Sequence, residues 1–166
     1  MKLWCFLFAT FLCSNAYSAN PEPVTVNVTF VAPITITEVA DLNFGLVSTD
    51  IINETVIIQT DGTRGSTNNA LLLGAGLSHP ADVTITATVG LAVTIVVDSL
   101  GAGTGYTLSL PTCKYGAASE AACSSLSTTS LASATMLIGM TLTGNNNDVG
   151  SATAVTSSFN VTMTYN

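Results

Sequence analysis

Residues 82–89 read DVTITATV, and this stretch decides the fold class of the chain. Its valines, isoleucine and alanine alternate with threonines and an aspartate, and a period of two residues places the two sets on opposite faces of a β-strand. Gly90 ends the stretch, and residues 91–97 form a more continuously apolar run that is typical of a buried strand. The pair predicts a β-sheet with one face in a hydrophobic core.

The same alternation marks residues 24–31 and 159–165. The apolar positions are Val24, Val26, Val28 and Phe30 in the first segment and Phe159, Val161, Met163 and Tyr165 in the second. An exported chain with such a segment near each end can lend a strand to another copy of itself, because an extended segment can add to an exposed sheet edge.

Further short strands are predicted between these segments, at residues 34–37, 41–47, 55–60, 70–73, 106–110 and 136–142. Gly, Asn and Asp clusters separate them, and the chain leaves room for a single helical turn at residues 117–122. Short strands at regular spacing favour an all-β sandwich. No linker rich in Pro or Gly divides the chain, so we expect one domain.

Residues 1–19 have the pattern of a secretory signal peptide, with Lys2, an apolar run at residues 3–12 and small residues before Ala19. The net charge of the full chain is −7, and loss of Lys2 with the leader makes it −8. Only Arg64 and Lys114 remain as strong cations, which excludes a phosphate-binding surface and therefore nucleic acid as a partner. The apolar residues fall in short runs, so we expect a protein that is not embedded in a membrane.

Two cysteines, Cys113 and Cys123, lie outside the leader. In an oxidising compartment we expect them to form one disulfide that closes a short loop. The alternative, a metal-binding or catalytic pair, has no cluster of His or carboxylate residues nearby in the sequence.

Residues that carry chemistry are sparse, and the sequence predicts no enzyme, no cofactor and no metal site. The one histidine, His79, precedes Pro80 in a predicted loop, and the carboxylates are dispersed. Residues 145–148 read NNND, which favours a turn over a calcium loop. Arg64 is expected to pair with a neighbouring acid, with contact to a glycan or carboxylate ligand as the alternative.

Three segments carry a family resemblance: PITITEVADLNFG at residues 33–45, DGTR at 61–64 and FNVTMTY at 159–165. They resemble a family of exported bacterial domains of unknown function, which in turn is similar to archaic chaperone–usher pilins, the spore coat protein U-like proteins. The resemblance runs over the chain that follows the leader, through short motifs.

The resemblance implies an immunoglobulin-like β-sandwich that lacks one strand and is completed by donor-strand exchange. Residues 20–32 would then be an N-terminal donor extension, with Val24, Val26, Val28 and Phe30 filling pockets, and residues 33–166 the pilin-like sandwich. The acceptor edge would contain Phe159, Val161, Met163 and Tyr165. Partners would be neighbouring copies in a homopolymer, with a periplasmic chaperone and an outer-membrane usher in transit.

The resemblance thus implies a structural subunit of a bacterial surface fibre, a pilus or fimbria that supports adhesion or biofilm. Its location would be the periplasm in transit and then the cell surface. In those pilins a disulfide usually ties the region after the donor strand to a later strand, whereas here the cysteines are Cys113 and Cys123. The alternative is a monomeric secreted sandwich that binds a carbohydrate or a surface, with its first strand folded into its own domain.

Overall fold

The computed structural model describes residues 23, 25–74, 76–145 and 156–166. These residues fall into two units that divide between Phe30 and Val31, and each unit is described by itself. The expected leader (residues 1–19), residues 20–22 of the expected extension, Val24 and most of the expected turn at 145–148 lie outside the described residues.

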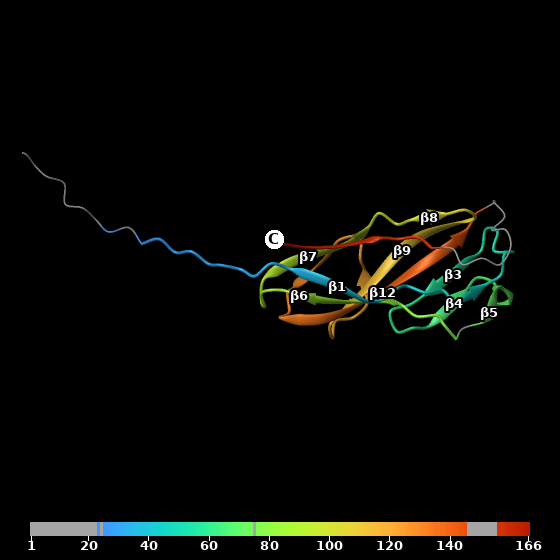
Figure 1. Cartoon of the computed structure of the whole chain (residues 1–166), viewed down its shortest axis with the longest axis horizontal. Coiled ribbons are helices and arrows are strands. Elements are labelled where there is room, and N and C mark those ends of the chain that lie inside the picture. The colour runs from blue at the N-terminus through green and yellow to red at the C-terminus, as the bar shows by residue number, and fades with distance from the viewer. Residues whose placement is uncertain (1–22, 24, 75, 146–155) are drawn as a thin grey trace, which may run out of the picture. The chain divides into compact units, whose positions relative to one another are not determined.

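The second unit is all-β, and its strands pair in antiparallel sheets (Figure 1). Its strands are β1 (Thr35–Ala40), β2 (Leu46–Val47), β3 (Thr55–Ile58), β4 (Arg64–Ser66), β5 (Leu72–Gly74), β6 (Ala81–Thr86), β7 (Ala92–Asp98), β8 (Ala102–Gly103), β9 (Tyr106–Tyr115), β10 (Ala121–Ala122), β11 (Leu126–Thr129), β12 (Ser133–Gly144) and β13 (Asn160–Tyr165). A single 3₁₀ turn, η1 (Asn69–Leu71), precedes β5.

The largest sheet is organised by β12, whose twelve residues pair with three other strands. Its first half pairs with β6 and its second half with β3, while β9 pairs along the other side. The change of partner falls at Gly139, where a Cβ would lie 2.5 Å from the carbonyl oxygen of Ile58. Glycine is required there because the backbones approach too closely for a side chain. β1 pairs with β6 and forms one edge of this sheet.

A second sheet contains three strands in the order β11-β7-β13. β7 is central, and its Val93, Ile95 and Val97 are buried while the residues between them are half-buried. In the first sheet, Ala81, Val83 and Ile85 of β6 are buried in the same alternating way. The period-two pattern of residues 82–89 therefore predicts the inward face of β6 as far as Thr86.

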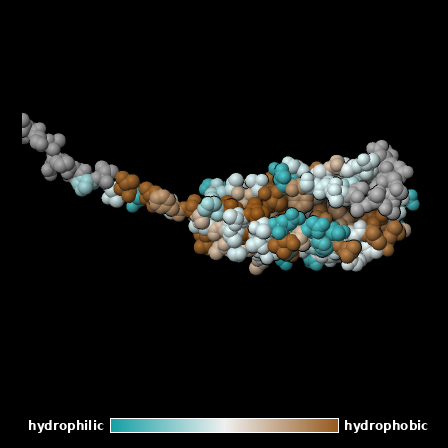
Figure 2. All heavy atoms as spheres, viewed as in Figure 1, coloured by the Kyte–Doolittle hydropathy of each residue, from teal (hydrophilic) through white to brown (hydrophobic). Residues whose placement is uncertain are grey.

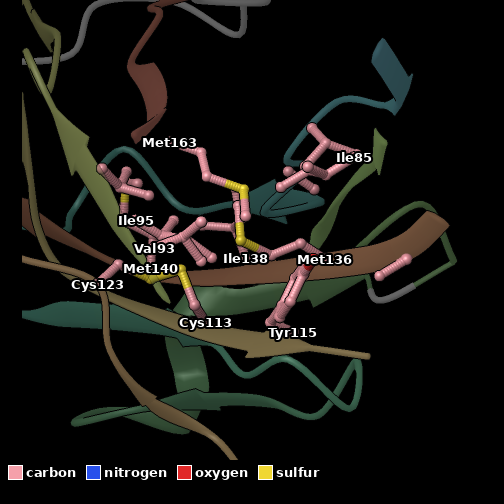
Figure 3. Close-up of a cluster of buried hydrophobic side chains, with 14 residues drawn as sticks. Ile85, Val93, Ile95, Cys113, Tyr115, Cys123, Met136, Ile138, Met140 and Met163 are labelled. Carbon is pink, nitrogen blue, oxygen red and sulfur yellow. A yellow bond between two sulfur atoms is a disulfide. The ribbon is translucent and has the colours of Figure 1, made fainter. Parts of the chain in front are cut away.

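The main core lies between the inward faces of these two sheets. Its fully buried side chains include Ile85, Ile95, Met136, Ile138 and Met140, and Figure 3 shows them converging with Met163 and both cysteines. At about 25 cal/mol per Å² of apolar surface removed from water, this core supplies most of the driving force for folding.

Cys113 of β9 and Cys123 form a disulfide, as the sequence predicts, and both are fully buried. Cys123 lies where the chain crosses from the first sheet to the second, between β10 and β11. Its amide N–H donates to the carbonyl of Pro111, and its own carbonyl accepts from the N–H of Val97 in β7. The cysteine thus has a backbone hydrogen bond toward each sheet.

Several local predictions differ from the structure. Residues 117–122 contain a turn and the short strand β10 in place of a helical turn, because Ala121 and Ala122 pair with β9. The predicted strand at 70–73 begins as η1, since the Asn68 side chain accepts a hydrogen bond from the Ala70 N–H and caps a turn. Four short strands were not predicted: β4, β8, β10 and β11.

The predicted strand at residues 82–89 also ends earlier than its alternation suggests. Val89 was expected on the core face with Val83, but it is 63% exposed. Gly90 follows with a φ of 85°, and its N–H donates to the carbonyl of Ser130, so the chain turns before Val89 can enter the core.

Candidate binding groove

The two sheets each end in a strand with one unpaired edge. β1 pairs with β6, and β13 pairs with β7. In the part of the chain that the structure describes, no strand pairs with the other edge of either one. Unpaired N–H and C=O groups along an edge strand form a template for another strand.

A groove of about 1140 Å³ lies between β1 and β13. Its apolar lining comes from both sheets and from the segments beside them: Ile36, Val83, Leu108, Leu142, Phe159 and Val161. Several of these side chains also pack against the main core. Figure 2 shows groups of apolar atoms among polar ones on the face of the domain where β1 and the red C-terminal strand are seen in Figure 1. The groove is therefore an opening into the apolar interior, and its sides are the edges of β1 and β13 with which no strand pairs among the described residues.

The structure divides the predicted acceptor edge into three parts. Phe159, just before β13, and Val161 line the groove. Met163 is 7% exposed and belongs to the main core. Tyr165 lies beyond the residues that line the groove. The alternation itself is observed, because the apolar residues of β13 are more buried than the polar residues between them.

Beyond one end of the groove, Tyr165 makes a set of hydrogen bonds that we call the Tyr165 clasp. Its hydroxyl donates to the carbonyl of Ala32 at 3.0 Å and accepts from the N–H of Thr88 at 2.7 Å. The N–H of Ala32 in turn donates to the Thr88 hydroxyl at 2.7 Å. The clasp joins the end of β13 to the segment before β1, and the groove lining stops short of it, at Ile36 and Thr162.

Replacement of Tyr165 by phenylalanine is expected to lower the free energy of unfolding by about 1–2 kcal/mol. Two hydrogen bonds to backbone groups are lost, a half-buried one from the Thr88 N–H and an exposed one to the Ala32 carbonyl, and each contributes about 0.5–1.5 kcal/mol. Urea denaturation measures the change. Thr164→Val is the matched control, because Thr164 is exposed on the opposite face of β13 and its replacement is expected to stay within about 0.5 kcal/mol. Equal effects of the two substitutions would contradict the clasp.

The described residues of the expected donor segment do not form a strand. Val26, Val28 and Phe30 are 80%, 66% and 90% exposed. Apolar side chains in an alternating pattern are rarely left exposed in this number without a partner. Within the single chain, the predicted donor residues thus bury little of their apolar surface.

The other end of the groove, which we call the loop end, is formed by residues 43–49 and Leu77. Here β2 and β5 form a small sheet over a second core cluster of Ile51, Val56 and Leu71. Arg64 holds this sheet, since its guanidinium donates to the carbonyls of Leu46 and Gly74 at 2.6 Å each. Arg64 was expected to pair with an acid, but its guanidinium binds these two carbonyls. Burial lowers the pKa of this guanidinium.

Titratable groups near the groove are few. Glu38, Asp41 and Tyr106 line it, and one carboxylate oxygen of Asp41 lies 3.6 Å from Nε2 of His79. His79 also exchanges two backbone hydrogen bonds with Asn43, which fixes the loop beside the groove. Among the described residues, no three His, Cys, Asp or Glu side chains gather closely enough to hold a metal ion. The same residues contain no helix that is long and apolar enough to cross a membrane.

The predicted acceptor site did not include the wall of the groove that β1 forms. Ile36 lies in the run ITIT at residues 34–37, whose alternation predicted a strand but not the position of that strand at a sheet edge beside the groove. Ala32 and Thr88 had no such signal, because their role in the clasp depends on backbone groups that any residue carries.

Comparison with known proteins gives one finding. No curated protein and no solved structure matches the chain. A family model does match, over residues 34–165, from the residue before β1 to the last residue of β13. The chain therefore belongs to the family described as Domain of unknown function (DUF4402).

Proposed function

We propose that this protein is a structural subunit of a bacterial surface fibre, in which each copy lends its N-terminal extension to the groove of the next. In this proposal the domain is an immunoglobulin-like sandwich that lacks one strand. The missing strand would lie between β1 and β13 and would be supplied by residues 24–30 of another copy.

The observation that carries the proposal is that one chain contains both halves of the contact. It has an apolar groove between two unpaired strand edges, and an exposed segment with apolar residues at every second position. A strand of seven residues spans about 23 Å and the six residues of β1 about 20 Å, so the segment matches the groove in length. Strand addition would satisfy the edge hydrogen bonds and bury the alternate side chains together.

The position of the clasp sets the direction of the inserted strand. Each extension leaves its own domain at Val31, beside the clasp. For copies to continue in a row, the donating domain must lie at the loop end of the acceptor, because the clasp end carries the acceptor's own extension. The donor would then run antiparallel to β13 and parallel to β1. A strand that folded back into its own groove would run the opposite way.

Under this proposal the chain would be exported before it assembles. Residues 1–19 would direct the chain to the periplasm, and the fibre would be displayed on the cell surface in support of adhesion or biofilm. An open apolar groove is an aggregation hazard before assembly. A periplasmic chaperone that covers the groove, and an outer-membrane usher where exchange occurs, would remove this hazard.

The direct test uses a synthetic peptide of residues 20–31 and the chain from residue 20 with Phe30→Asp, which cannot donate its own strand well. The peptide is expected to raise the melting temperature of this variant, because it fills the groove and satisfies the edges of β1 and β13. A peptide with Val26, Val28 and Phe30 all replaced by serine is the control. Size exclusion and negative-stain microscopy of the unsubstituted chain are expected to show linear multimers.

An unsubstituted chain that stays monomeric at high concentration, with a variant that does not respond to the peptide, would contradict the fibre proposal. The groove would then take no strand from this segment, and the alternative of a monomeric binding module would replace the fibre proposal.

A further inference from the structure

Two groups of three exposed large apolar side chains lie at opposite ends of the groove, while Val39, Ile52, Ile57 and Leu110 are exposed elsewhere on the domain. At the clasp end lie Val31, Val89 and Leu131, which are 47%, 63% and 39% exposed. Hydrogen bonds bring their segments together: Ala32 to Thr88, and the Gly90 N–H to the Ser130 carbonyl. We call these three residues the clasp-end patch.

The second group lies at the loop end of the groove. Leu46, Leu73 and Leu77 are 64%, 65% and 69% exposed, and we call them the loop-end patch. Leu46 and Leu77 also line the groove, so this patch is continuous with the proposed acceptor site. Leu46 and Leu73 lie on β2 and β5, which Arg64 holds together through the carbonyls of Leu46 and Gly74.

We infer that the clasp-end patch of each copy docks on the loop-end patch of the copy that accepts its strand, as a second contact in the fibre. This inference rests on the proposed function. It adds a partner, a second copy of this chain, for two surfaces that strand insertion alone does not use.

The length of the connection carries the inference. The donor segment ends at Phe30, the domain begins at Val31, and the clasp fixes Ala32 on both its N–H and its carbonyl. Two residues of fully extended chain reach about 7 Å at most. When Phe30 occupies the loop end of an acceptor groove, the donor's clasp end must therefore come into contact with the acceptor's loop end.

Charge also favours this contact. The segments at the clasp end, residues 31–34, 87–91 and 130–133, contain no charged side chain, although the chain as a whole carries a net charge of −7. Two copies of an acidic protein repel each other, and an uncharged apolar end is where they approach at least cost. Burial of both patches removes apolar surface from water on each side.

Crosslinking of the full chain from residue 20 tests the inference. Val89→Cys and Leu73→Cys are introduced together, and a short bismaleimide is added. The native cysteines form a buried disulfide and do not react with it. A covalent ladder of dimers, trimers and longer species is expected. Val89→Cys with Leu110→Cys is the control, because Leu110 is 73% exposed but lies within β9, away from both ends.

The peptide experiment separates this inference from the proposed function. If the peptide raises the melting temperature and multimers form, but the Val89–Leu73 pair gives no more ladder than the control pair, the end contact is overturned and strand exchange stands. If the peptide has no effect and no multimers form, the proposed function is overturned, and the end contact falls with it. A ladder specific to the Val89–Leu73 pair supports the inference.

Discussion

Phe30→Asp is expected to abolish multimer formation by the chain from residue 20. Phe30 is 90% exposed in the single chain and would be buried in the groove of the next copy under the proposed function. Loss of a buried phenylalanine costs about 1.5–3 kcal/mol, and a carboxylate in an apolar groove adds a penalty of several kcal/mol. At about 1.4 kcal/mol per tenfold in affinity, strand exchange would weaken by roughly a thousandfold or more.

Thr29→Asp is the matched control for this substitution. Thr29 adjoins Phe30 and also lies in the exposed segment, but it belongs to the opposite face of the alternating pattern. The same charge at this position is expected to leave multimers intact in size exclusion. If both substitutions act alike, the effect comes from charge in the extension, and insertion of alternate side chains into a groove is contradicted.

Replacement of both Cys113 and Cys123 by alanine is expected to lower the free energy of unfolding by about 3 kcal/mol. The disulfide closes a loop with a sequence separation of 10, and the chain-entropy model gives a loop of this size nearly 3 kcal/mol. For a domain of this size the melting temperature is expected to fall by about 10 °C. The disulfide ties Cys113 of the first sheet to Cys123, whose carbonyl accepts from the N–H of Val97 in the second sheet, so its removal loosens the place where the chain crosses between the sheets.

Urea denaturation of the double variant and of the unsubstituted chain gives this change directly. The control is the unsubstituted chain unfolded with a reducing agent, in which the disulfide is absent but no side chain is replaced. A loss below about 1 kcal/mol in both samples would contradict the role of the disulfide at the crossing between the sheets.

The inward faces of β6 and β13 could be predicted from the sequence because period two is a direct consequence of strand geometry. Residues 82–86 and 160–165 have the predicted alternation of burial, and the disulfide forms between the two expected cysteines. The short strands β4, β8 and β10 could not be predicted from the sequence. Their residues are mainly Gly, Ala, Ser and Arg, and they are strands only because longer strands lie beside them.

The sequence predicted only one of the two walls of the groove. Phe159 and Val161 follow the terminal alternation, so the sequence places them on one face. The opposite wall depends on β1 being an edge strand, which is a property of sheet order and not of local pattern. The clasp was not readable for a similar reason, since the Tyr165 hydroxyl bonds to backbone groups of residues 77 and 133 positions away.

The hydrogen bonds from Arg64 to the carbonyls of Leu46 and Gly74 affect the susceptibility of the domain to proteases. Outside the expected leader, Arg64 and Lys114 are the only residues after which a trypsin-like protease cuts. Lys114 lies in β9, which pairs with β12 on one side and with β10 on the other, one residue from the disulfide. The fold protects both sites from cleavage, because neither can enter a protease active site without prior local unfolding.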